Sequence, residues 1–360
     1  MHAARTELLL RYQTALGRVH GTAVTRAALA TLTGPHALVA LGKAAGAMAA
    51  GARAVPTLEL VTTFTAAPHG YGDADYHGGH PVPDAASLAA GAAFMDWLRA
   101  LPPRLPLIAL VSGGASACIE ALRDGATLDA LAARTRALLA SGAGIAEINA
   151  ERARFSALKR GGARALAGDR EIVLWVLSDV PGDDPALVGS GPFAGGAARR
   201  LSTNAEAVAA VGADHPAQAL AGDAAVQGRA IAEFLRAAAP GIWVWGGETT
   251  VALPPAPGRG GRCQHLALAA AIALDGCGGI TLLAAGTDGI DGDSGDAGAL
   301  VDGGTAARIR AEGLDPAVAL AHADSNAALA AAGDLVHTGP TGTNVMDLVI
   351  AVRRSHTAHL

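Results

Sequence analysis

The chain has 360 residues, of which 51% are hydrophobic, 16% charged and 3% aromatic, and its formal net charge is −5. This balance of scattered acids and bases argues against a nucleic-acid-binding surface and against a polybasic membrane patch. Charges interrupt the only early apolar run, and no later window offers 18 uninterrupted apolar residues, so neither a signal peptide nor a membrane span is expected. The sequence therefore predicts a soluble, cytoplasmic protein with a core large enough for about two domains.

Short apolar runs, most of them continuous, alternate with alanine-rich stretches along the chain. The runs lie at 36–41, 58–64, 105–111, 172–177, 242–245, 280–284, 335–337 and 348–352. Continuous runs are typical of strands buried on both faces, and their alternation with helices indicates an α/β fold with mainly parallel sheets. An alanine-rich helix is predicted at 223–239, and Pro240-Gly241 separates it from the next strand. We place the domain boundary there, with an N-terminal domain at 1–238 and a C-terminal domain at 239–360.

Glycines, hydroxyls and carboxylates directly follow six of these runs. They form the stretches GKAAG from Gly42, SGGAS from Ser112, SDVPGDD from Ser178, GGETT from Gly246, GTDGIDG from Gly286 and TGPTGTN from Thr338. Ligands of open parallel sheets bind beyond the carboxyl ends of the strands. For any single stretch, an ordinary turn or helix N-cap is the structural alternative. Six of them, spread over both predicted domains, favour an active site between the domains.

The standard fingerprints of several enzyme classes are absent. Gly42-Lys43 is not part of a P-loop, because Ala37 and Ala44 stand where that motif needs a glycine and a serine or threonine. No G-x-G-x-x-G or G-x-S-x-G occurs, so a dinucleotide-dependent oxidoreductase and a serine hydrolase lack support. The acidic run that begins at Asp288 does not follow the EF-hand pattern. Without an HExxH or a Cys/His cluster, a structural zinc site is not supported either.

Cysteine and lysine usage adds two further expectations. Cys118, Cys263 and Cys277 include no CxxC pair, and we expect free thiols instead of a disulfide framework. Among 27 basic residues, only Lys43 and Lys159 are lysines. Because a compact ammonium and a planar guanidinium are not interchangeable, each lysine marks either a specific role or chance.

The residues at the strand ends supply the parts of a phosphoryl-transfer site. Such a site needs cations on the transferring oxygens, carboxylates for Mg²⁺ and a group that accepts the acceptor's proton. Lys43 opens a predicted helix and provides one cation. The candidate Mg²⁺ ligands or bases are Asp179, Asp183, Glu248 and Asp288.

Two groups of basic residues leave alternatives open. Arg259 and Arg262 lie on the glycine-rich stretch GRGGR, which suits either closure over phosphates or a solvated surface loop. Arg152, Ser156 and Lys159 are spaced i, i+4 and i+7, which predicts one face of a helix. That face is either a solvated stripe or a polar wall for an anionic substrate.

Together these motifs resemble the class II glycerate 2-kinases, whose C-terminal part is called the MOFRL domain and whose members are sometimes labelled hydroxypyruvate reductase. The matching stretches span almost the whole chain in order: GKAAGAMA, GHPVPD, SGGASA, EIN with R-x-x-x-S-x-x-K, SDVPGDD with SGP, GGETTV, GRGGR-x-Q, GTDGIDG and TGPTGTNVMD. The resemblance implies ATP- and Mg²⁺-dependent phosphorylation of the 2-hydroxyl of D-glycerate. It also implies a larger Rossmann-like N-terminal domain, with mainly parallel strands, and a smaller MOFRL domain around an interdomain cleft.

Residue by residue, the family's active-site lysine falls on Lys43 and its arginine on Arg262. With Asp179 these form the predicted catalytic group, and Asp179 and Asp288 are the predicted Mg²⁺ ligands. Residues expected to bind ATP or substrate are Gly42, Ser112, Gly113, Gly114, Ser116, Lys159, Gly247, Glu248, Asp288, Thr341 and Asn344. Cys263, His265, Glu151 and Arg154 depart from the family's usual residues, which bears on the choice of acceptor.

Two other functions remain as alternatives. One is an NAD(P)H-dependent hydroxypyruvate reductase, motivated by the family's second label and opposed by the missing dinucleotide fingerprint. The other is a non-catalytic regulator that binds a nucleotide or a sugar phosphate, opposed by the many acids and bases at strand ends. The expected partners are small molecules, with no nucleic acid and no membrane. The sequence leaves the oligomeric state open, and a homo-oligomer is one of the alternatives.

Overall fold

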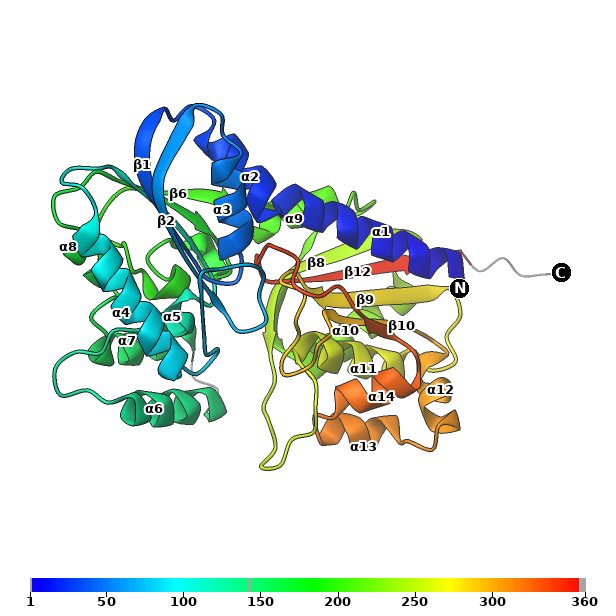
Figure 1. Cartoon of the computed structure of the whole chain (residues 1–360). Helices are drawn as coiled ribbons and strands as arrows, with labels where there is room; N and C mark the ends of the chain where they lie inside the picture. The colour runs from blue at the N-terminus through cyan, green and yellow to red at the C-terminus, as the bar shows by residue number, and fades with distance from the viewer. Residues whose placement is uncertain (1, 142–143, 356–360) are drawn as a thin grey trace. The chain divides into compact units, whose positions relative to one another are not determined.

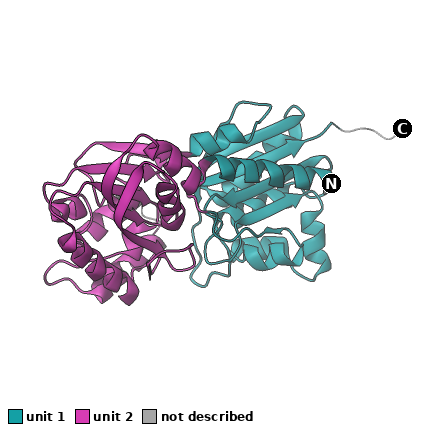
Figure 2. Cartoon of the chain, turned by 45° about the horizontal axis from the view of Figure 1, so that its top comes forward, with its two compact units in different colours: residues 1–18, 204–341, 346–360 teal, residues 19–203, 342–345 magenta. Residues whose placement is uncertain are grey.

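A computed structural model describes residues 2–141 and 144–355. The chain forms two compact units with one six-stranded sheet in each (Figure 1, Figure 2). Unit 1 comprises residues 1–18, 204–341 and 346–360, and unit 2 comprises residues 19–203 and 342–345. Helices and strands are mixed along the chain, which confirms the α/β class. Within the described ranges, no helix combines the length and apolarity that a membrane crossing requires.

Unit 2 contains a fully parallel sheet. Its strands are β1 (Gly34–Leu41), β2 (Leu58–Pro68), β3 (Tyr76–Gly78), β4 (Leu107–Ser112), β5 (Ile172–Leu177) and β6 (Ala198–Ser202). They are ordered β3-β2-β1-β4-β5-β6, and every pairing is parallel. This is the strand order of a Rossmann sheet, as the resemblance implied. All six residues of β4 are buried, which explains its uninterrupted apolar sequence.

Helices cover both faces of this sheet. They are α2 (Gly21–Leu29), α3 (Ala45–Arg53), α4 (Ala85–Ala100), α5 (Ala115–Cys118), α6 (Leu128–Ala140), α7 (Ile145–Phe155) and α8 (Gly162–Ala167), with short 3-10 turns at Pro181–Asp183 and Val188–Ser190. The core on one face joins Phe94 and Leu98 of α4 and Cys118 of α5 to Val39 and Val111 of the central strands. α2 and α3 lie on the other face (Figure 1).

The sheet of unit 1 is mixed and not mainly parallel, so this part of the sequence prediction was wrong. Its strands are β7 (Gln218–Asp223), β8 (Gly241–Thr250), β9 (Ile280–Gly286), β10 (Gly298–Asp302), β11 (Leu335–Val336) and β12 (Asp347–Arg353). In the order β11-β10-β9-β12-β8-β7, only β7 and β8 run parallel. Burial on both faces gives antiparallel strands the same continuous apolar sequence as parallel ones, so the pattern does not separate the two.

The helices of unit 1 also lie on both sides of its sheet (Figure 1). They are α1 (His2–Val19), α9 (Asn204–Ala210), α10 (Ala224–Ala237), α11 (Arg262–Ala273), α12 (Thr305–Ala311), α13 (Pro316–Ala321) and α14 (Ser325–Ala331). Nine consecutive residues of α11, from Cys263 to Ala271, are buried. A helix that is buried on all sides is mostly apolar on every face, and α11 is accordingly rich in alanine and leucine.

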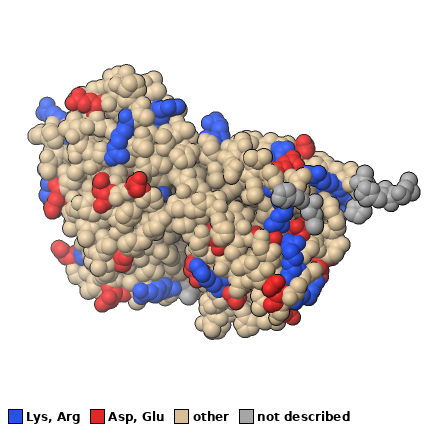
Figure 3. Space-filling view, turned by 45° about the vertical axis from the view of Figure 1, so that its right-hand side comes forward, with Lys and Arg blue, Asp and Glu red and all other residues tan. Residues whose placement is uncertain are grey.

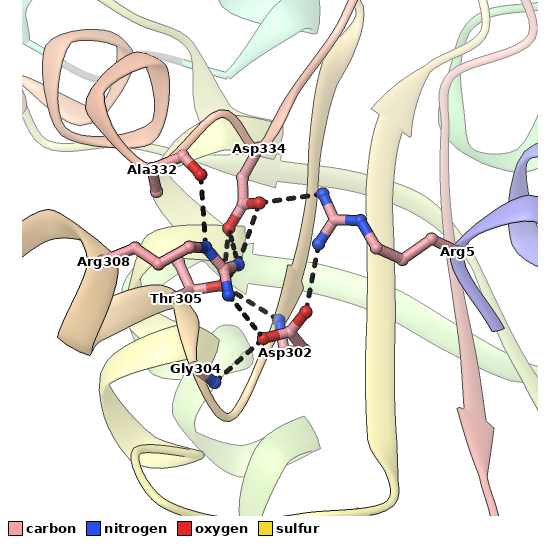
Figure 4. Close-up of polar contacts among 7 residues, drawn as sticks. All are labelled: Arg5, Asp302, Gly304, Thr305, Arg308, Ala332 and Asp334. Atoms are coloured by element: carbon pink, nitrogen blue, oxygen red, sulfur yellow. Dashed lines mark hydrogen bonds and ion pairs between the residues drawn. The ribbon is translucent and has the colours of Figure 1, made fainter. Parts of the chain in front are cut away.

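The N-terminal helix α1 is fixed to unit 1 by polar contacts. Arg5 donates hydrogen bonds to Asp302 (3.1 Å) and Asp334 (2.8 Å). Both carboxylates are buried and also accept from Arg308 of α12, so two arginines neutralise them (Figure 4). About two turns further along α1, the Tyr12 hydroxyl donates to the Gly286 carbonyl at the end of β9 (2.6 Å).

These contacts explain why the compact units differ from the predicted division at residues 238 and 239. α1 and β7 both precede that boundary, yet both belong to unit 1. β7 is in unit 1 because it pairs along its whole length with β8. Conversely, residues 342–345 belong to unit 2, where Gly21 donates from its amide to the Gly342 carbonyl and the Thr343 hydroxyl donates to the Val19 carbonyl. Local apolar patterns carry no information on such long-range pairing.

Charged side chains are spread over the surface. On the face shown in Figure 3, acidic and basic groups are scattered, with broad uncharged surface between them. The three cysteines are free, as predicted, and Cys118 and Cys263 are buried.

Candidate active site

The carboxyl ends of β1 and β4 form the topological switch point of the parallel sheet, because the strand order reverses between them. The loops after these strands are bonded to each other. The Lys43 amide donates to the Gly113 carbonyl (2.8 Å) and the Ala44 amide to the Ser112 hydroxyl oxygen (3.1 Å). At Gly42, with φ +104°, a Cβ would lie 2.4 Å from the Ser112 carbonyl oxygen, so this approach requires glycine.

Lys43 lies just before α3, as predicted. Its Nζ is 5.3 Å from the centroid of the Tyr71 ring, within the range of a cation–π contact. Its Cγ lies 3.1 Å from the position that a Cβ on Gly114 would occupy, and His80 and Pro68 border the same position. The side chain is therefore held against the glycine turn after β4.

Asp179, in the loop after β5, lies against the same turn. Its Oδ2 accepts a hydrogen bond from the Asn344 amide (2.8 Å). A Cβ on Gly113 would lie 1.5 Å from Asp179 Oδ2 and 2.4 Å from Asn344 Nδ2. No side chain at residue 113 is compatible with this pair. Unit 2 thus brings together seven of the predicted residues: Gly42, Lys43, Ser112, Gly113, Gly114, Asp179 and Asn344.

The predicted helix face of Arg152, Ser156 and Lys159 does not form, because α7 ends at Phe155. Lys159 is buried and forms an ion pair with the fully buried Glu120. Burial lowers the pKa of Lys159, and the Glu120 carboxylate opposes this shift. The predicted substrate-binding lysine therefore has a carboxylate partner within the protein.

Ser116 lies near Arg152 in this region. The Arg152 guanidinium donates from Nη1 to the Ser116 hydroxyl oxygen (3.4 Å) and from Nη2 to the Pro81 carbonyl. The Ser116 and Ser190 hydroxyl oxygens are 2.7 Å apart. Burial lowers the pKa of Arg152 to about 10, although Glu120 raises it.

In unit 1, two carboxylates hold Arg262, the first residue of α11. Asp347 accepts two hydrogen bonds, from Nε (2.6 Å) and Nη2 (3.0 Å), and Glu248 lies 2.8 Å from Nη2. Burial alone would lower the pKa of Arg262, but the carboxylates of Asp347 and Glu248 keep this pKa well above its usual range. Asp347 is 1% exposed, whereas Arg262 and Glu248 are about one-third exposed. The buried Asp347 thus fixes the guanidinium, which remains partly accessible to solvent.

Asp291 caps the helix that carries Arg262. Its two carboxylate oxygens accept from the amides of Cys263 (3.1 Å) and Gln264 (2.8 Å). A Cβ on Gly261 would lie 2.2 Å from Asp291 Oδ1, so glycine is needed just before the helix. Burial raises the pKa of Asp291 to about 7, against the effect of these amides and of Arg262. The start of α11 is thus already occupied by a carboxylate.

The other predicted residues of unit 1 lie in two places. Asp288 is buried, its Oδ1 accepts from the Ile290 amide (3.2 Å), and its carbonyl accepts from the Thr341 amide (3.2 Å). Gly247, with φ +142°, has a structural reason to be glycine, since a Cβ would lie 2.1 Å from the Leu220 carbonyl oxygen of β7.

The residues that depart from the family pattern have partners of their own. Glu151 forms ion pairs with Arg134 and Arg154 on the surface of α6 and α7. His265 is buried in α11, with its Nδ1 3.2 Å from the Ser325 hydroxyl oxygen. Arg259 lies on the exposed stretch before α11.

Whether Mg²⁺ suits this protein is tested by the chemistry of its donors. Among residues 2–141 and 144–355, no group of three or more His, Cys, Asp or Glu side chains is arranged to hold a metal ion. Mg²⁺ in kinases usually takes only one or two carboxylates and completes its shell with phosphates and water. The loop after β5 offers hard oxygens of that kind, since Asp183 Oδ1 and the nearby Ser178 Oγ are buried without a hydrogen-bond partner. The donor set fits a nucleotide-bound Mg²⁺ and not a protein cage.

Sequence reasoning assigned no role to Asp347, Asp291 or Glu120. Asp347 stands at the end of the quoted stretch TGPTGTNVMD, and its position directly before an apolar run was a usable signal. Asp291 is one of four closely spaced aspartates with no feature to single it out. Glu120 follows a buried helical turn and carries no motif at all.

Comparisons with known proteins agree with this architecture. Residues 8–223 match the family model described as "Domain of unknown function (DUF4147)", and residues 241–347 match "MOFRL family". The chain is 33% identical to a protein named "D-glycerate 2-kinase" from Thermotoga maritima, covering 88% of this chain and 90% of that one. It is 37% identical to a "Putative hydroxypyruvate reductase" from Agrobacterium vitis, covering 75% and 85%.

A solved structure is also similar. The crystal structure of a glycerate kinase from Thermotoga maritima matches with a TM-score of 0.82 and 29% identity over 98% of this chain and the whole of that one. The order of the two matched regions, the full-length relatives and the shared fold lead to one conclusion: the chain belongs to the MOFRL family of glycerate kinases.

Proposed function

We propose that this protein is a glycerate 2-kinase, which transfers the γ-phosphoryl group of ATP to the 2-hydroxyl of D-glycerate and releases 2-phospho-D-glycerate and ADP. The observation that carries the proposal is the group at the switch point of the parallel sheet. There Lys43 and Asp179 lie against one glycine turn, Gly113-Gly114. Phosphoryl transfer requires a cation and a carboxylate, and a glycine turn beside them lets a phosphate approach the backbone.

Lys43 and Arg262 neutralise negative charge on the phosphoryl oxygens during transfer in this proposal. Phosphoryl transfer offers little covalent chemistry for a protein to perform, so positioned cations supply much of the rate. Asp347 keeps the Arg262 guanidinium in one orientation through two hydrogen bonds. Glu248, more exposed than Asp347, is the partner that a phosphate would compete with.

The 2-hydroxyl of the acceptor attacks phosphorus while the bond from phosphorus to the oxygen of ADP breaks. Asp179 and Asp288 are the carboxylates proposed to orient that hydroxyl, accept its proton and hold Mg²⁺. Mg²⁺ held by these carboxylates would offset negative charge on the phosphates. Asn344 fixes one oxygen of Asp179, and Gly113 leaves room for it. We include a cytoplasmic location in the proposal, which the free cysteines suit.

A coupled assay of ADP release tests the proposal. Purified protein with ATP, Mg²⁺ and D-glycerate should release ADP, and omission of D-glycerate should reduce the rate to background. The relatives named hydroxypyruvate reductase motivate the second candidate function. The same preparation with hydroxypyruvate and NADH should leave the absorbance of NADH unchanged. Oxidation of NADH without ADP release in the first assay would favour the reductase.

A further inference from the structure

Arg152 carries a buried charge that no carboxylate neutralises. The residue is 6% exposed, and its Nε has no hydrogen-bond partner. Its other nitrogens contact only the Ser116 hydroxyl and the Pro81 carbonyl, and no ion pair with a described carboxylate forms. Buried arginines are normally paired, because desolvation of a guanidinium is costly.

The neighbouring groups cannot supply the missing negative charge. Glu120 is bonded to Lys159, so these two charges cancel and Arg152 leaves a net charge of +1 in the cluster. The hydroxyls cannot help either. Ser190 donates its proton to Asn149 Oδ1 (2.7 Å), so Ser116 donates its own to Ser190, and each hydroxyl offers Arg152 at most a neutral lone pair.

Arg262 of the same molecule shows which group can bind the edge of a guanidinium that is only half used in Arg152. The edge formed by Nε and Nη2 of Arg262 receives the two oxygens of the Asp347 carboxylate. On Arg152 the same edge holds one backbone oxygen, that of Pro81, at Nη2 and nothing at Nε. Arginine and carboxylate match each other in this side-on geometry.

We propose that Arg152 binds the carboxylate of the hydroxy-acid acceptor through Nε and Nη2, with the Pro81 carbonyl giving up its place. This inference rests on the proposed kinase function, whose acceptor is an anion. Pro81 lies on an exposed loop, so its displacement opens a path to the guanidinium. Its neighbour His80 borders Gly114 beside Lys43. A carboxylate on Arg152 therefore anchors the acceptor next to the proposed phosphoryl site, and Lys159 serves only to neutralise Glu120.

The first test changes the substrate and leaves the protein intact. D-Glycerate and its uncharged amide carry the same hydroxyls, so a cation that binds the carboxylate distinguishes them. We expect kcat/KM of the wild-type enzyme to be about 100-fold higher for the acid, corresponding to charge-assisted hydrogen bonds. Equal values for acid and amide would overturn the proposal.

The second test assigns that discrimination to Arg152. Arg152→Met should raise the KM for D-glycerate about 100-fold, leave the KM for ATP unchanged and bring the acid-to-amide ratio close to one. Arg152→Lys keeps the charge but loses the planar pair of donors. Its KM for D-glycerate and its acid-to-amide ratio should lie between those of the wild type and of Arg152→Met. Arg136→Met is the matched control, since Arg136 is an exposed arginine of the neighbouring helix α6, and it should behave as wild type. A folded Arg152→Met enzyme that still prefers the acid as strongly as wild type would refute the assignment.

Calorimetric titration of D-glycerate without nucleotide separates this inference from the proposed function. Wild-type protein that binds the acid but not the amide, with the preference lost in Arg152→Met and reduced in Arg152→Lys, supports the site even if no ADP is released. Wild-type protein that releases ADP but binds both acceptors equally upholds the kinase and overturns the Arg152 site. Absence of acid binding by the wild type also overturns the site.

Discussion

The two sheets position a cation in different ways. In the parallel sheet of unit 2, Lys43 is placed by backbone geometry: a glycine with positive φ, a strand end and hydrogen bonds between two loops. In the mixed sheet of unit 1, Arg262 is placed by buried carboxylates, Asp347 on its side chain and Asp291 on the start of its helix. We infer that substitutions near Lys43 act through steric fit, whereas those near Arg262 act through charge.

The largest effect is expected at Lys43 itself. Lys43→Met should reduce kcat about 10³-fold, because one positioned cation in phosphoryl transfer has that order of effect. Its thermal unfolding should be close to that of the wild type, since Lys43 is partly exposed and methionine keeps an apolar contact with the Tyr71 ring. Turnover within tenfold of wild type in the ADP-release assay would remove Lys43 from the mechanism.

Gly113→Ala tests whether backbone space matters as much as charge in unit 2. The added methyl would coincide with the Asp179 carboxylate, so Asp179 must move. We expect kcat in the ADP-release assay to fall about 10²-fold, because misplacing a reacting group by about 1 Å costs that much.

Gly17→Ala provides the control for this substitution. Gly17 is an exposed residue of α1 with open space around it, so the change should leave turnover unaltered and raise stability by about 1 kcal/mol. Equal turnover of Gly113→Ala and Gly17→Ala would show that the position of Asp179 is irrelevant.

Asp347→Asn tests the charge-based placement in unit 1. The amide keeps the shape of the carboxylate but loses its charge and one acceptor, which leaves Glu248 as the remaining carboxylate on Arg262 among the described residues. We expect turnover to fall about tenfold and stability to fall by about 2 kcal/mol, less than complete removal of a buried partner costs. Glu248→Gln, at the more exposed partner, should lower the free energy of unfolding by less than about 1 kcal/mol. A larger loss of stability in Glu248→Gln than in Asp347→Asn would contradict this division of roles.

The smallest effect on turnover is expected at Asp291, whose change should appear in the pH dependence of stability. Its folded-state pKa of about 7 lies above the usual value of 3.8, so the folded state retains a proton that the unfolded state releases. This group therefore makes stability fall as pH rises from about 4 to 7, with no further change above that range. Asp291→Asn should remove that contribution. Urea unfolding of both proteins at pH 4.5 and 7.5 measures this contribution. The same change in the free energy of unfolding between the two pH values in both proteins would contradict the assignment.

The sequence predicted the parts of the fold that local pattern controls. The run at 172–177 matches β5 to the residue, and the predicted helix at 223–239 contains α10. β6 escaped notice because its sequence, ARRLS, is mostly polar and partly exposed at the sheet edge. Strand direction in unit 1 was wrong because burial on both faces looks the same in parallel and antiparallel strands.

The same division applies to the candidate site. Glycine turns at strand ends are local, so Lys43, Gly113 and Asp179 could be selected from spacing. The pairs Arg262–Asp347 and Lys159–Glu120 join distant segments, and nothing in either segment names its partner. Lys159 illustrates the consequence: a lone lysine suggested a ligand contact, and its partner in the fold is a buried glutamate.

Product analysis by ³¹P NMR tests the central claim most directly. Wild-type protein incubated with ATP, Mg²⁺ and D-glycerate should give one phosphorylated acid whose phosphorus couples to the single proton on C2, in amounts equal to the ADP formed. A phosphorus coupled to the two protons of C3, or ATP left intact while D-glycerate is present, would contradict a glycerate 2-kinase.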